Sequence, residues 1–200
     1  GTENNLNILK GIYEFLKDKV EIKCNTGISD IAVKENGYEV TTVNDEVYSS
    51  KYLIAAPGRA GAEWFSNQCK KLDIPLINNQ VDIGVRVELP APVMERITDK
   101  LYESKLVYHS PTFGDEVRTF CMNPYGEVVT ENYSGIATVN GHSYANKRTP
   151  NTNFALLVAK HFSEPFKDSN GYGESIARLS NMLGGGVIVQ RFGDLVRGRR

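Results

Sequence analysis

The sequence predicts a mixed α+β fold, in which a partial α/β unit with a β-meander is followed by a mainly antiparallel β domain with helical insertions. Apolar residues recur at helical spacing over residues 5–18. Runs between residues 27 and 56, separated by an Asn-Gly pair and an Asn-Asp pair, predict a meander of three or four strands. Short strand-like runs separated by turn residues then fill the rest of the chain. We therefore expect two domains, residues 1–80 and residues 81–200.

The first domain carries three further predicted elements. Residues 20–24 (VEIKC) are typical of a short strand. Residues 52–56 (YLIAA) do not alternate, which is typical of a strand buried on both faces. After the small-residue turn at 57–61 (PGRAG), apolar residues return at helical spacing, so we expect a helix over residues 59–72 whose inner face includes Trp64.

The second domain is predicted to contain two helices among many short strands. The helix at residues 91–100 has Pro92 in its first turn, where a missing N–H costs little, and the helix at residues 171–183 ends at three glycines. The segments NPYG, YSG and VNGHS are predicted as turns, and a strand from residue 187 leads to a last helical turn. The other predicted strands are residues 82–89, 105–109, 116–122, 126–133, 135–140 and 153–162.

Composition and charge narrow the function classes. The chain has 200 residues, a net charge of −1 and 40% hydrophobic residues, so nothing favours a nucleic-acid or anionic-membrane partner. No apolar run approaches the roughly 20 residues of a spanning helix, and no signal peptide opens the sequence. Cys24, Cys69 and Cys121 are odd in number and far apart. This argues against a disulfide framework and a metal site, and it favours the cytoplasm.

The segment AAPGRAG, residues 55–61, is the most unusual local feature. Alanine and glycine leave the backbone bare, so a large group can approach it closely. That group can be another strand, a packed helix or a flat cofactor, and the residues alone leave these alternatives open. The positions that would meet it are Ala56, Gly58 and Arg59.

The order of the segments resembles a known family. The chain contains, in this order, the meander leading to AAPGRAG and then DIGVRVE, TFCMNPYGEVV, VNGHSY, NTNFALLV and QRFGDLVRGRR. This set of segments is similar to bacterial FAD-dependent dehydrogenases related to the HI-type flavoproteins. Those proteins have a glutathione-reductase-like fold that binds two dinucleotides. The resemblance implies an internal part of an FAD-dependent oxidoreductase that transfers hydride between the flavin and a small-molecule substrate, with NAD(P)H as a candidate donor. It also implies that Ala56, Gly58 and Arg59 lie beside the flavin or its pyrophosphate.

The sequence departs from that family in ways that bear on FAD binding. It contains no strand followed by a G-x-G-x-x-G loop, although the pyrophosphate of FAD needs such a helix N-terminus. After FCM, residues 123–126 read NPYG, where the family tends to read C-P-G-G. We expect residues 1–80 to be a remnant of the FAD-binding domain, residues 81–200 to be most of the substrate domain, and the isolated chain to be inactive. The unpaired sheet edge beside residues 52–56 predicts self-association.

No residue is a secure catalytic group, and six are weak candidates. Two histidines titrate near neutrality and can act as acid or base, or can bond locally in turns. A thiol in the strand RTFCM can take part in redox chemistry beside a flavin, or can pack as a small hydrophobic group. Two arginines and an asparagine in the family-like segments suit a carboxylate or phosphate, or serve in structural pairing. The set is His142, His109, Arg118, Cys121, Asn153 and Arg191.

The alternative is a non-enzymatic binding module whose β domain offers a groove to a peptide or a sugar. Aromatic residues of the second domain favour it. They are Tyr102, Tyr108, Phe113, Tyr125 and Tyr133. A hydrolase is disfavoured because the sequence has no G-x-S-x-G elbow. A strand and G-x-G-x-x-G loop encoded shortly before Gly1 would favour the flavoenzyme, and a natural start at Gly1 would favour the module.

We predict that the purified 200-residue chain retains little or no FAD after dialysis, because a bare turn alone cannot hold the pyrophosphate. Visible absorbance of the dialysed protein measures retention, and denaturing the same sample to release any flavin is the control. A flavin spectrum that survives dialysis would contradict this prediction.

Overall fold

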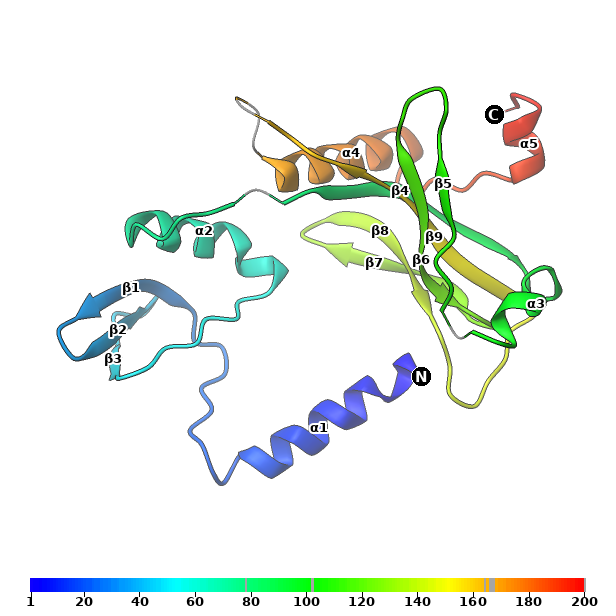
Figure 1. The fold of residues 1–200 in the computed structure, drawn as a ribbon. Helices are drawn as coiled ribbons and strands as arrows, with labels where there is room; N and C mark the ends of the chain where they lie inside the picture. The colour runs from blue at the N-terminus through cyan, green and yellow to red at the C-terminus, as the bar shows by residue number, and fades with distance from the viewer. Residues whose placement is uncertain (78, 102, 164, 166–167, 200) are drawn as a thin grey trace. The chain divides into compact units, whose positions relative to one another are not determined.

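The computed structural model describes residues 1–77, 79–101, 103–163, 165 and 168–199. The chain forms two compact units: unit 1 contains residues 1–10 and 78–200, and unit 2 contains residues 11–77. Helices and antiparallel strands occur together along the chain (Figure 1), which confirms the predicted mixed α+β class.

Unit 2 is built on an antiparallel meander. Strands β1 (Ile28–Lys34), β2 (Gly37–Thr42) and β3 (Val47–Ser50) pair in the order β1-β2-β3. The first hairpin turns at the predicted Asn-Gly pair, where Gly37 has a φ of 143°. The second turn is held by the buried hydroxyl of Thr42, which accepts the N–H groups of Asn44 and Glu46 at 3.2 and 3.1 Å.

Helix α2 (Ala62–Lys71), which follows the 3-10 turn η2 (Arg59–Gly61), is tied to β1 by side chains. The buried Gln68 accepts the N–H of Ile31 at 3.0 Å and donates to the carbonyl of Ser29 at 3.2 Å. Trp64 Nε1 donates to the same carbonyl at 3.0 Å. These bonds reach backbone groups that the meander itself leaves unpaired, so they fix the helix on the outer edge of β1.

Two predicted strands of the first part are absent. Residues 20–24 and 52–56 have no strand conformation, and Tyr52 and Ile54 are 77% and 92% exposed. A strand needs backbone hydrogen bonds to a neighbouring strand, and neither segment is paired with a strand in the described part of the chain. The prediction was wrong because apolar content was taken for burial.

Unit 1 is a four-stranded antiparallel sheet with a separate hairpin (Figure 1). The sheet order is β4-β9-β6-β5, and the hairpin joins β7 to β8. The strands are β4 (Val81–Pro90), β5 (Val107–His109), β6 (Glu116–Asn123), β7 (Glu127–Tyr133), β8 (Ile136–His142) and β9 (Asn151–Lys160). The other elements are η1 (Thr2–Asn4), η3 (Ala91–Val93), α3 (Glu95–Thr98), α4 (Ser169–Gly184) and α5 (Phe192–Val196), while α1 (Asn5–Leu16) runs from unit 1 into unit 2.

Helix α4 is capped at both ends, by Asp168 before its first residue and by Gly185 after its last. The carboxylate of Asp168 accepts the N–H of Gly171 at 2.8 Å, and Gly185 ends the helix in the left-handed conformation at φ 66°, as the predicted glycine stop requires. The side chain of Asn181 binds both backbone groups of Ala137, at 2.7 and 2.8 Å. This pair of bonds attaches the helix to β8.

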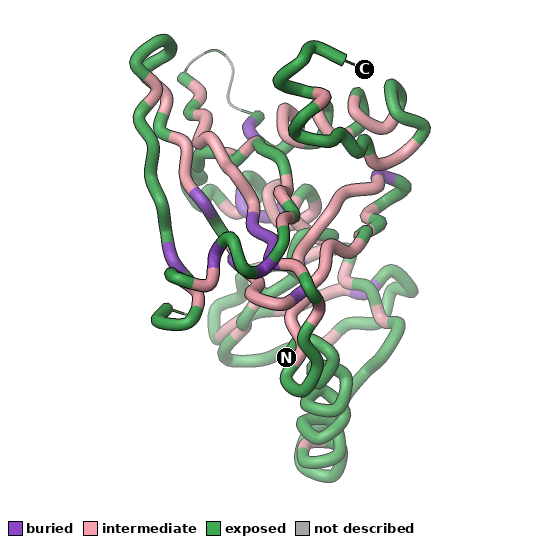
Figure 2. Tube along the Cα trace, turned by 90° about the vertical axis from the view of Figure 1, so that its right-hand side faces the viewer, coloured by how far each residue is buried: buried purple, intermediate pink, exposed green. Residues whose placement is uncertain are grey.

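The core of unit 1 is small. Met94, Met122 and Phe154 are buried together, with side chains of β4, β9 and α3 packed against them. Figure 2 shows that buried segments are short and scattered among half-buried ones, and that α1 is exposed almost throughout. Among the described residues, no helix has both the length and the apolar character that a membrane span requires.

Three details of unit 1 differ from the prediction. Gly141 and His142, expected in a turn, belong to β8, and residues 187–190 form no strand. Strand β6 contains a bulge between Phe120 and Asn123, in which Cys121 has a φ of 46°. Turn-like composition misled the first assignment, because β7 pairs with β8 through to His142 and imposes the strand conformation.

We predict that Gln68→Ala lowers the free energy of unfolding by about 2 kcal/mol, because it leaves the buried N–H of Ile31 without its acceptor and removes one of the two donors to the Ser29 carbonyl. Urea unfolding followed by the fluorescence of Trp64, the single tryptophan, measures the change in unit 2. The neighbouring exposed Asn67→Ala is the matched control and should cost less than about 0.5 kcal/mol. Equal stabilities of the two variants would refute the role of Gln68.

Candidate functional site

An apolar groove of about 430 Å³ lies in unit 2. It is lined by side chains of β1 and β2, by the segment 53–57, and by Gly61 and Trp64. Most of its lining is aliphatic, and the exposed Ile54 stands on its wall. A groove of this kind can receive a flat apolar ring system.

The glycine bend borders this groove. Ala56 lines it, and Gly58 follows with φ 67° and ψ −167°, a conformation that disfavours other residues. A side chain at Gly58 would meet no other part of the described chain within 4 Å, so the backbone there is open. Arg59 is exposed at the start of η2, and no side chain caps α2 at Gly61. The three predicted cofactor positions therefore lie in an accessible bend beside an apolar surface.

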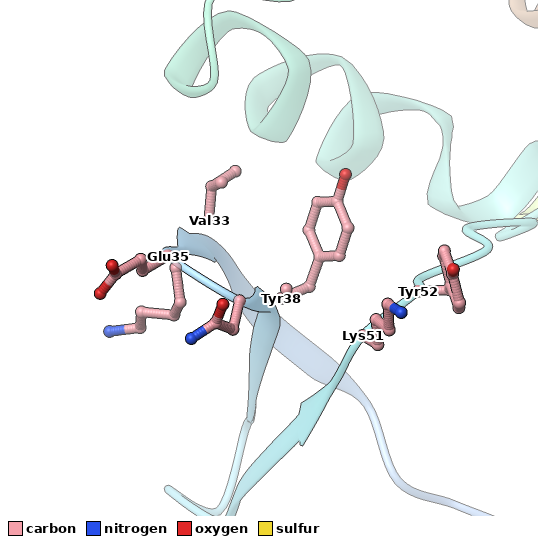
Figure 3. Close-up of a pocket in the computed structure, with 8 residues that line it drawn as sticks. Val33, Glu35, Tyr38, Lys51 and Tyr52 are labelled. Atoms are coloured by element: carbon pink, nitrogen blue, oxygen red, sulfur yellow. The ribbon is translucent and has the colours of Figure 1, made fainter.

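A second hollow of unit 2, of about 580 Å³, lies at the tip of the β1-β2 hairpin. Figure 3 shows Val33 and Tyr38 on the paired strands, Glu35 at the turn, and Lys51 and Tyr52 on the chain that leaves β3. It is wide, and its polar groups are hairpin and strand-end side chains. It offers no convergent set of acid, base or nucleophile, so we do not assign chemistry to it.

A polar cluster lies between the sheet and the β7-β8 hairpin of unit 1. Arg86 Nε donates to Oδ1 of Asn153 at 2.8 Å, and Arg86 Nη2 donates to the carbonyl of Cys121 at 2.7 Å. Asn123 Nδ2 donates to the same carbonyl at 2.8 Å and lies 3.4 Å from Oδ1 of Asn153. Side chains from β4, β6 and β9 therefore converge on one point.

Strand geometry explains the convergence. Side chains two residues apart share one face of a sheet, so Asp82, Arg86 and Glu88 of β4 point the same way. Arg86 pairs with Ala155 of β9, and Asn153 is opposite Glu88. The bulge of β6 turns the carbonyl of Cys121 toward the guanidinium.

Gly141 of β8 makes room for the cluster. A Cβ at this position would overlap Arg86 Nη2 and Asn123 Nδ2. The hairpin backbone can therefore lie against the guanidinium only with glycine here.

The cluster contains one buried amide group without an acceptor and one guanidinium without an ion pair among the described residues. Asn153 is fully buried, and its Nδ2 has no hydrogen-bond acceptor among the described residues. Burial lowers the pKa of the Arg86 guanidinium, while Cys121 and the carboxylate of Glu131 act in the opposite direction. No described carboxylate lies within 4.0 Å of Arg86, whereas Arg118 on the same sheet is paired with Asp82 at 2.7 Å. A buried donor and an unpaired cation thus occur together.

The structure brings only two of the predicted catalytic candidates together. Cys121 and Asn153 meet at Arg86, the former through its carbonyl rather than its thiol. Arg118 is occupied by an ion pair, and Arg191 is exposed immediately before α5.

Among the described residues, no hydrogen bond joins the imidazole of either histidine to this cluster. His109 is the exposed last residue of β5. His142 ends β8, and its ring lies 4.8 Å from the ring of Tyr144. The described residues contain no group of three His, Cys, Asp or Glu side chains that could hold a metal ion.

The aromatic residues that favoured a binding module occupy different environments. Tyr108 and Phe113 are 61% and 81% exposed near the β5-β6 connection. Tyr125 donates to Glu95 at 3.2 Å and lies under Arg148. Tyr133 belongs to β7, and Tyr102 lies outside the described residues.

Arg86 and Gly141 were not predicted as site residues, although they lie in the family-like segments DIGVRVE and VNGHSY. The alternation of Asp82, Gly84, Arg86 and Glu88 did indicate a polar face of β4. Such a face normally meets water, and nothing local showed that the β7-β8 hairpin would cover it.

The chain was compared with known proteins. Residues 80–197 match the model of a family described as FAD-dependent protein, C-terminal domain-like. No curated protein matches the chain. The matched range contains the whole Arg86 cluster and leaves the apolar groove outside it.

We predict that Gly141→Ala destabilises unit 1 by about 1–3 kcal/mol, because the new methyl group displaces Arg86 and Asn123. Thermal unfolding of the full chain measures the change. Gly193→Ala, whose Cβ would meet nothing within 4 Å, is the control and should cause no loss. A Gly141→Ala variant as stable as the wild type would show that the hairpin does not constrain the guanidinium.

Proposed function

Because the chain belongs to the family of FAD-dependent proteins with this C-terminal domain, we propose that it is part of an FAD-dependent oxidoreductase. The family match associates the chain with FAD. The observation that carries the proposal further is the uncovered apolar groove beside the bare bend at Gly58 in unit 2. The flavin ring would lie in that groove, and unit 1 would bind the substrate.

The residues of the groove fit the ring portion of FAD. The isoalloxazine is flat and largely apolar, and the segment 53–57 presents Leu53, Ile54 and Pro57 toward the hollow that Trp64 borders. The open backbone at Gly58 permits close approach of the ring or its phosphates. The fit to the pyrophosphate is weaker, because only the uncapped start of α2 is available to it.

FAD, when bound, accepts or supplies a hydride, with a small molecule and NAD(P)H as the proposed partners in that exchange. The chain itself would hold the ring against apolar side chains, exclude water from its face, and orient the substrate. His109 and His142 are the proposed sources of a proton, since histidine is the side chain that most often serves as a general acid or base. We also propose that the protein acts in the cytoplasm.

We predict that FMN and FAD quench the fluorescence of Trp64 with saturation and similar midpoints, whereas ADP does not quench it. The reason is that the groove receives the flavin ring and not the adenine or the pyrophosphate. Binding should be too weak to survive dialysis. Titration of the full chain, with free tryptophan correcting for light absorbed by the flavin, provides the measurement.

Two matched variants sharpen this test. Ile54→Lys, on the groove, should weaken FMN binding about tenfold, because it removes roughly 1–2 kcal/mol of apolar contact. Val33→Lys, at an exposed apolar position outside the groove, should leave binding unchanged. Absence of saturable quenching, quenching by ADP, or equal weakening by both variants would each exclude the groove as the flavin site.

A further inference from the structure

We propose that Arg86, Asn153 and the β6 bulge of unit 1 form a binding site for the carboxylate of a small-molecule ligand. That this ligand is the substrate of the oxidoreductase rests on the proposed function. The binding itself depends only on the cluster.

The guanidinium of Arg86 has donors to spare. Arginine carries five N–H groups, and Arg86 uses one on Asn153 and one on the Cys121 carbonyl, which leaves three. These three belong to Nη1 and Nη2, and no described residue accepts from them. Arg86 is only half-buried, so part of it faces solvent. The two fixed bonds hold the planar group in one orientation, which prepares the free edge to bind two oxygens side by side.

Asn153 supplies an independent indication of a ligand. Its side chain is fully buried and is oriented by the Arg86 bond to Oδ1, so Nδ2 points away from that bond with nothing to donate to. Buried polar groups are nearly always satisfied, and an exception calls for an acceptor that the described residues do not supply. A ligand oxygen and an ordered water are the two acceptors of the right size.

The acidic groups around the cluster bond to partners other than Arg86. On this face of the sheet β4 carries two acidic residues, but Asp82 is paired with Arg118, and Glu88 accepts from Asn151 at 3.0 Å and from the N–H of Val128 at 3.2 Å. Glu131 accepts from Asn140 at 2.8 Å. Arg86 is therefore left without an ion pair, although a half-buried cation normally has one.

Carboxylate suits this site better than phosphate. A carboxylate is planar, carries one charge, and matches the edge of one guanidinium. A phosphate carries close to two charges at neutral pH and would meet one cation with Glu131 nearby. The backbone at Gly141 also lies against the guanidinium and restricts the space around it.

We predict that butyrate binds the full chain in the absence of any flavin. The probes are butyrate, butyramide and inorganic phosphate, each added at matched ionic strength. Side-chain NMR signals of Arg86 Nε–H and Asn153 Nδ2–H₂ should shift with saturation for butyrate only, because the amide lacks the charge and the phosphate lacks the fit. Arg86→Lys should weaken butyrate binding by about tenfold or more, since the two-pronged contact is lost.

Two further variants keep the test decisive if Arg86→Lys fails to fold. Asn153→Asp keeps the shape and gives Arg86 an internal carboxylate, so it should fold and lose butyrate binding. Arg118→Lys, at the arginine already paired with Asp82, is the matched control and should bind butyrate normally. The proposal is overturned if no signal saturates, if butyramide or phosphate acts like butyrate, or if Asn153→Asp binds as the wild type does. Failure of the flavin titration would leave this result standing, and failure here would leave the groove untouched.

Discussion

The antiparallel pairing of β9 with β4 and β6 is the constraint on which unit 1 depends. Strand β9 pairs with β4 along its whole length, from Lys160 opposite Val81 to Asn151 opposite Pro90. The other edge of β9 pairs with β6. Near the start of β9, the consecutive residues Thr152, Asn153 and Phe154 are all buried. One strand thus supplies a core side chain to one face and the buried amide of the polar cluster to the other, because neighbouring residues of a strand point to opposite faces.

Burial alone does not explain how the chain keeps its shape. The core of unit 1 centres on Met94, Met122 and Phe154, and many large apolar side chains elsewhere are exposed. In unit 2, the bonds of Gln68 and Trp64 to the backbone of β1 connect the helix to the meander. Because polar bonds rather than a large core connect the helix to the meander, apolar side chains of unit 2 stay exposed. A flat apolar ligand can bind to such a surface.

The two candidate sites offer different chemistry. The groove of unit 2 is apolar, with an open backbone at Gly58, and suits a ring that needs contact and exclusion of water. The cluster of unit 1 presents one oriented cation and one unsatisfied amide, which suit a small anion. An oxidoreductase that handles a small acid needs both kinds of contact, one for its cofactor and one for its substrate. The family match covers residues 80–197, which include the cluster and leave out the groove.

Local backbone preferences alone determined several elements. The Asn-Gly hairpin, the glycine stop of α4 and the runs that became β4, β6 and β9 follow from neighbouring residues, so the sequence was sufficient to predict them. Tertiary structure decided the rest. Residues 52–56 are apolar but pair with no strand among the described residues, whereas Gly141 belongs to β8 because β7 pairs alongside it. Arg86 and Asn153 are 67 positions apart, and only the register of β4 on β9 brings them into contact.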